Sequence, residues 1–108
     1  MIDPDKIYQH IMAAAKEWTE ADEEARRLAK LERIVLAEIM NQYAADAVTM
    51  AERKSMALAS PEFKLHVNNL VIARTKANVT KARYEAAKSL AELRRSQEST
   101  RRAEMGIR

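Results

Sequence analysis

The sequence predicts an all-α protein, a long helical hairpin in which a short helix connects two long amphipathic helices that pack like a coiled coil. Three observations lead to this prediction. The chain of 108 residues contains one Gly and two Pro, so little interrupts a helix. Much of its apolar content is Ala, the best helix former but a small core residue. Apolar residues recur at steps of three and four, the period of a coiled-coil helix.

The first long helix is expected over residues 4–43. Asp3 is a suitable N-cap, Pro4 fits the first helical position, and Asp5 complements the positive end of the helix dipole. The following seam repeats in heptads and comprises Ile7, Ile11, Ala14, Trp18, Ala21, Ala25 and Leu28. This spacing predicts one continuous apolar stripe that faces another helix.

Glu32 occupies the next position of this seam and interrupts it. The stripe resumes through Leu31, Val35, Ile39 and Tyr43, a shift that resembles a stutter in a coiled coil. We therefore expect the supercoil to relax near Glu32.

Two helix-start signals lie in the middle of the chain. Thr49 followed by Glu52 fits a capping box, which predicts a short helix over residues 50–59. Ser60 and Pro61 then offer an N-cap and a first helical residue, so a second long helix is expected over residues 61–103. The polar end at 104–108 is expected to fray. All of residues 1–108 would form a single helical domain.

The second long helix carries two apolar rows. One follows the steps of three and four through Phe63, His66, Leu70, Ala73, Ala77, Thr80, Tyr84, Ala87 and Ala91. The other repeats every seven residues on a different face and consists of Leu65, Ile72, Val79, Ala86 and Leu93. One row would contact the first helix and the other a second copy, so we expect a homo-oligomer, an oligomeric helical bundle. The residues expected to pack helices together are Trp18, Leu28, Val35, Ile39, Phe63, Leu70, Ile72, Val79, Tyr84 and Leu93.

The composition of the chain indicates the cellular location of the protein and excludes cysteine chemistry. Without Cys there are no disulfides, thiolate nucleophiles or Cys-bound zinc. No stretch approaches the roughly 20 apolar residues of a membrane span, and the N-terminus lacks the features of a secretory signal. The expected location is the cytoplasm, with no membrane contact.

Charge is distributed unevenly along the chain. Residues 1–60 hold 8 Lys and Arg against 11 Asp and Glu, a net charge of −3, whereas residues 61–108 hold 11 against 5, a net charge of +6. A basic row repeats every seven residues on the second long helix, with further arginines beside its end. The candidate contact residues for nucleic acid or a partner are Arg74, Lys81, Lys88, Arg94, Arg95, Arg101 and Arg102.

Two interpretations of the basic row remain open. Arg74, Lys81 and Lys88 could pair with acidic residues of the first helix or simply face water. The arginines at 94, 95, 101 and 102 lie beyond the apolar pattern and have few acidic neighbours, which favours an exposed contact role. Any binding of DNA would be non-sequence-specific, because the sequence contains no zinc-finger, helix-turn-helix or RNA-recognition signature.

Catalytic chemistry has no support in the sequence. His10 and His66 lack a second His or a Cys at ligand spacing, and no serine has a base to activate it. The chain also lacks a phosphate-cradling Gly loop. We therefore expect a protein that is not an enzyme and has no cofactor, no metal and no small-molecule substrate.

Three segments carry a resemblance to a known group of proteins. They are Ala-Glu-Arg at 51–53, Ala-Ser-Pro-Glu-Phe-Lys at 59–64, and the Arg-rich run at 94–105. This half of the chain resembles small all-helical proteins of tailed phages and prophages that are encoded near DNA recombination genes. The resemblance implies an accessory role in phage DNA recombination or replication, by binding nucleic acid or a DNA-handling protein. The alternative is a protein–protein interaction module, such as an inhibitor of a host defence system or a virion assembly adaptor.

Overall fold

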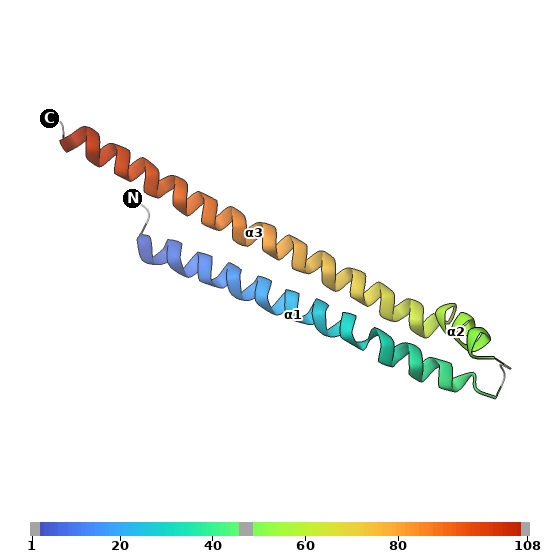
Figure 1. Ribbon diagram of the computed structural model, residues 1–108. Helices are drawn as coiled ribbons and strands as arrows, with labels where there is room; N and C mark the ends of the chain where they lie inside the picture. The colour runs from blue at the N-terminus through green and yellow to red at the C-terminus, as the bar shows by residue number, and fades with distance from the viewer. Residues whose placement is uncertain (1–2, 46–48, 107–108) are drawn as a thin grey trace. The chain divides into compact units, whose positions relative to one another are not determined.

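The computed structural model describes residues 3–45 and 49–106, and within them the fold is all-α. It contains α1 (Pro4–Gln42), α2 (Met50–Leu58) and α3 (Pro61–Gly106), with the short α2 between the two long helices (Figure 1). The predicted fold class, a long helical hairpin with a short connecting helix, is confirmed. In the described part of the chain no helix is long and apolar enough to cross a membrane.

The chain divides into two compact units, although the sequence analysis treats it as one domain. The first unit consists of residues 1–19 and 78–108, and the second unit consists of residues 20–77. Each unit contains part of α1 and part of α3, and α2 belongs entirely to the second unit.

The start of each helix follows from its capping residues. Asp3 accepts a hydrogen bond from the backbone N–H of Asp5 at 3.0 Å and opens α1. Thr49, in an extended conformation, accepts one from the N–H of Glu52 at 3.1 Å and opens α2, so the predicted N-cap is confirmed. The buried Ser60 hydroxyl accepts from the N–H of Phe63 and opens α3.

The helix ends differ slightly from the predicted ones. α1 and α2 each end one residue earlier than expected, at Gln42 and Leu58. α3 continues to Gly106, so residues 104–106 of the expected frayed tail are helical, and residues 107–108 lie outside the described residues. The polar end of α3 stays helical because Arg, Gln, Glu, Ala and Met are all good helix formers.

The second unit contains two buried clusters. Ala21, Ala25, Ala73 and Ala77 form an alanine cluster, against which the half-buried Leu28 packs. The other cluster joins all three helices. It consists of Ile39, Ala57 and Phe63, with Val35, Leu36, Met40 and Tyr43 packed around it. Small alanines let α1 and α3 approach closely in the first cluster, whereas larger side chains fill the space beneath α2 in the second.

The first unit has a thinner core. Ala14 and Ala87 are buried, as is Thr80, and the larger seam residues Ile7, Ile11, Trp18 and Tyr84 are half-buried. Every position of the predicted α3 seam from Phe63 to Ala91 is buried or half-buried, which confirms that this row faces inward.

The stripe predicted beyond Glu32 is confirmed. Ile39 is buried, Leu31, Val35 and Tyr43 are half-buried, and Glu32 is exposed. Val35 lies seven residues after Leu28 and Ile39 lies fourteen after Ala25, so both keep the original heptad register, whereas Leu31 and Tyr43 depart from it. Relaxation of the supercoil near Glu32 stays a prediction.

Candidate functional site

An aromatic pair joins the two helices of the first unit. Trp18 of α1 and Tyr84 of α3 stack with ring centroids 5.4 Å apart and planes inclined by 25°. The Nζ atom of Lys81 lies 6.0 Å from the centroid of the Trp18 ring, and that of Lys88 lies 5.4 Å from the centroid of Tyr84. These four residues are called the aromatic–lysine cluster.

The sequence of α3 explains this arrangement. Lys81 precedes Tyr84 by three residues and Lys88 follows it by four, so both lysines project from the same side of the helix as the ring. A cation over an aromatic ring is stabilised by about 0.5–1 kcal/mol at an exposed site. Such a contact orients the ammonium group but is weak enough to be exchanged for a phosphate, and both lysines are exposed.

The basic row continues beyond this cluster. Within the first unit, Lys81, Lys88, Arg95 and Arg102 follow one another at seven-residue intervals of α3, and all four are exposed. Seven helical residues correspond to about 10 Å, so the row presents a cation about every 10 Å along one line of the helix. Arg101 is exposed beside this row, and Arg74 is exposed in the second unit.

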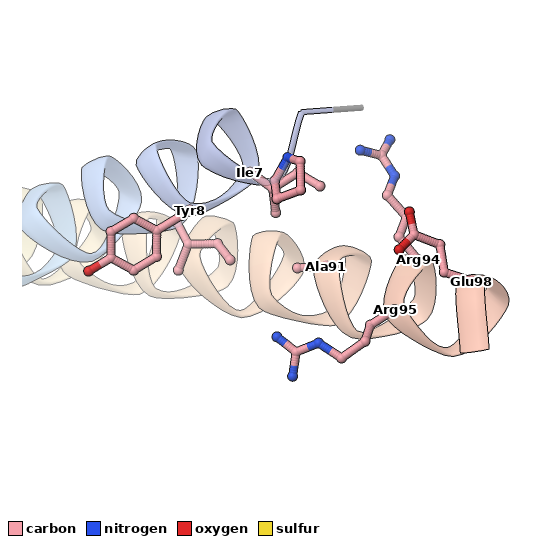
Figure 2. Close-up of a pocket in the computed structure, with 8 residues that line it drawn as sticks. Ile7, Tyr8, Ala91, Arg94, Arg95 and Glu98 are labelled. Atoms are coloured by element: carbon pink, nitrogen blue, oxygen red, sulfur yellow. The ribbon is translucent and has the colours of Figure 1, made fainter. Parts of the chain in front are cut away.

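A hollow lies where α1 begins. It has a volume of about 200 Å³ and is called the terminal hollow (Figure 2). Its lining consists of Pro4, Ile7, Tyr8 and Ile11 from α1 and Ala91, Arg94, Arg95 and Glu98 from α3. In Figure 2 the guanidinium groups of Arg94 and Arg95 point to opposite sides of α3. Arg94, expected to be exposed, is half-buried because it occupies the next position of the α3 seam.

A second hollow of about 320 Å³ also belongs to the first unit. Its walls are mostly small or apolar, with charge at its edge. It is lined by His10, Ala13, Ala14, Glu17, Arg83, Ala86, Ala87 and Leu90. Glu17 and Arg83 have opposite charges here, so this hollow is electrically balanced, whereas the terminal hollow has two cations against one carboxylate.

The two units differ in charge. The sequence of the first unit contains 10 Lys and Arg against 7 Asp and Glu, a net charge of +3, and that of the second contains 9 against 9, a net charge of zero. In the second unit Arg26 pairs with Asp22 at 2.9 Å, and Arg27 pairs with Glu24 at 2.7 Å. The hydrogen bond from Arg27 lowers the pKa of the Glu24 carboxyl and raises the pKa of Arg27. Glu24 therefore pairs within its own helix.

The predicted packing residues fall into two groups. Ile39, Phe63 and Leu70 are buried, and Trp18, Leu28, Val35 and Tyr84 are half-buried, as expected for contacts within the chain. Ile72, Val79 and Leu93 are 59%, 45% and 55% exposed, so they do not pack within the chain. Their contact with a second copy stays a prediction.

No three His, Asp or Glu side chains gather at metal-binding distance in the described ranges 3–45 and 49–106. His10 is exposed, and the half-buried His66 lies beside Phe63 with ring centroids 6.5 Å apart. The Nε2 atom of His66 is buried without a hydrogen-bond partner.

Comparison with protein-family models, with curated proteins and with solved structures finds no match to this chain. The first unit, with its basic row and its aromatic pair, is therefore the candidate functional site.

Proposed function

We propose that this chain is a non-enzymatic protein that binds nucleic acid without sequence specificity through the first unit. The observation that carries this proposal is the exposed row Lys81, Lys88, Arg95 and Arg102, two of whose cations lie over the Trp18–Tyr84 stack. Cations spaced along a helix can neutralise phosphates of a strand that follows it, without reading base edges. Aromatic rings beside them are the usual companions of such cations in single-strand binding.

The cellular role that fits this activity is an accessory one in phage DNA recombination or replication, in the cytoplasm of the host. The support for this part is the resemblance of residues 51–53, 59–64 and 94–105 to phage proteins. A contact function of this kind needs no cofactor or metal.

A second candidate is protein–protein interaction, and the outer face of α3 favours it. In the first unit, two rows on that face are exposed and free of charge over six heptad positions, although α3 is rich in charge elsewhere. These positions are Val79, Ala82, Ala86, Ser89, Leu93 and Ser96. An uncharged heptad strip is typical of a surface that pairs with another helix. We propose a second copy as its occupant, which light scattering would detect as a dimer or larger oligomer.

Fluorescence anisotropy with a labelled oligonucleotide tests nucleic-acid binding. Replacing Arg94, Arg95, Arg101 and Arg102 with Ala should weaken binding about tenfold or more at low salt, because four cations near the phosphates are lost. The matched control replaces Arg26, Arg27, Lys30 and Arg33 of the second unit with Ala. It removes the same charge from another exposed helical segment and should change affinity by about twofold at most.

Two results would count against this function. One is the absence of any DNA binding at low salt, and the other is an equal loss of affinity in the two quadruple variants. A stoichiometric protein partner captured from nuclease-treated host lysate would then favour the interaction-module alternative, a defence inhibitor or an assembly adaptor.

A further inference from the structure

The terminal hollow of the first unit combines an apolar lining with a tyrosine ring, two arginines and one glutamate. We propose that it receives one unpaired base of a single-stranded nucleic acid, while Arg95, Lys88 and Lys81 hold the phosphates that follow. This inference rests on the proposed function and adds to it the class of nucleic acid. Three properties of the hollow support it: its lining, its size and its position on the basic row.

The lining is apolar on the inside and aromatic at the side. Ile7, Ile11 and Ala91 form its apolar part, and Tyr8 contributes a ring that is 64% exposed. A single exposed tyrosine on a polar helix is an ordinary finding, but this one lines the hollow together with apolar side chains. Bases have apolar faces and polar edges, so they stack on such a ring and leave their edges toward water.

The size of the hollow suits a small group. About 200 Å³ is less than the roughly 300–1,000 Å³ of clefts that enclose drug-sized ligands. The hollow is also open to solvent, so it can receive a small planar or aliphatic group while the rest of the ligand stays outside.

The position of the hollow indicates the chemistry of the part of the ligand that remains outside it. Arg95 lines the hollow and lies seven residues after Lys88, so the basic row of the first unit leads into it. Arg94 adds a second cation on another side of α3 (Figure 2). Glu98 is the acidic member of the lining, and its carboxylate repels phosphate but can accept a hydrogen bond from an N–H group of a base, such as the ring N–H of thymine. A nucleic-acid strand matches this distribution of charge, because its backbone is anionic and its bases are neutral rings.

Single strands fit this arrangement and duplexes do not. In a duplex every base is stacked and paired, so placing one in the hollow requires it to flip out of the helix. An unpaired strand has no such cost. A duplex would still bind the cations of the row, but it would gain nothing from Tyr8 or from the apolar lining.

The test compares three labelled ligands of equal length in anisotropy titrations: a thymidine single strand, an abasic single strand and a duplex. We expect the thymidine strand to bind about fivefold to hundredfold more tightly than the abasic strand. Tyr8→Ala should remove this preference without weakening abasic binding, and Tyr8→Phe should retain it. Met12→Ala, at an exposed residue of the same helix outside the hollow, should change neither.

Each other outcome overturns the proposal. Equal binding of thymidine and abasic strands would show an electrostatic surface without a base site and leave the proposed function intact. A labelled acidic peptide with an apolar end is titrated as a fourth ligand, and if it binds in a Tyr8-dependent manner in place of the thymidine strand, the hollow is a peptide site. If none of the three nucleic acids binds at low salt, the proposed function fails together with the base site. Circular dichroism of each variant checks that α1 and α3 remain helical.

Discussion

The two units use the same helices in different ways. The second unit packs α1, α2 and α3 around Ile39, Ala57 and Phe63, carries no net charge, and pairs its arginines at 26 and 27 with acids on the same helix. The first unit has two helices, few fully buried residues and a net charge of +3. Its largest side chains, Trp18 and Tyr84, stay half-exposed and lie beneath lysines.

This difference suggests that the second unit contributes most of the folding stability and the first unit provides the binding surface. A buried cluster formed by three helices stabilises the fold, because apolar burial is the main favourable contribution to folding. A half-buried aromatic pair with cations over it stabilises less but leaves groups available to a ligand. The account therefore predicts that substitutions in the second unit change folding and those in the first change binding.

The largest expected effect on stability is at Phe63. It is 7% exposed and packs in the cluster that joins all three helices. Phe63→Ala should lower the free energy of unfolding by about 3–5 kcal/mol, since it leaves a cavity beneath α2. Urea denaturation followed by circular dichroism measures this. A loss below about 1 kcal/mol would show that this cluster is not the main core.

A smaller effect is expected at Trp18. Because the ring is half-buried, Trp18→Ala should cost about 2 kcal/mol, clearly less than Phe63→Ala. Trp18→Phe retains a ring against Tyr84 and should lose less than half of that amount. The same urea titrations compare the three variants. If Trp18→Ala destabilises more than Phe63→Ala, the contrast between the two units is wrong.

The smallest effect concerns the exposed pair Glu24–Arg27. The pKa of Glu24 is lowered below its ordinary value of 4.5, so its contribution to stability is present above that value and is lost as pH falls through the folded-state pKa. Glu24→Gln should lower the melting temperature slightly at neutral pH and not at all in acid or in high salt. An equal difference at every pH would contradict this ionic origin.

Much of the fold could be predicted from the sequence because its signals are local. Ser60 and Pro61 set the start of α3, and the apolar period identified the row that faces α1. The interruption at Glu32 was also predictable, because a carboxylate at a seam position stays exposed while the stripe resumes at Leu31, Val35 and Ile39. The end of α3 was placed too early, since a polar segment without an apolar stripe gives no sign of where its helix stops.

The candidate site was predicted only in part. The heptad period of α3 predicts which side of the helix carries Lys81 and Lys88. It does not predict which residues of α1 lie opposite them. The stacking of Trp18 on Tyr84 therefore required the structure, although lysines three before and four after a tyrosine were a signal that could have been used. The terminal hollow was not predictable either, because its two walls come from residues eighty or more positions apart in the sequence.

The salt dependence of DNA binding tests the central claim most directly. For single-stranded DNA, the logarithm of the association constant should fall with the logarithm of salt concentration by about 0.7 for each phosphate that the protein neutralises. Replacing Lys81, Lys88, Arg95 and Arg102 with Ala should reduce that slope by about 2–3. Replacing Arg26, Arg27, Lys30 and Arg33 should leave it unchanged. An equal change in both variants, or a slope near zero for the unaltered protein, would contradict a contact surface in the first unit.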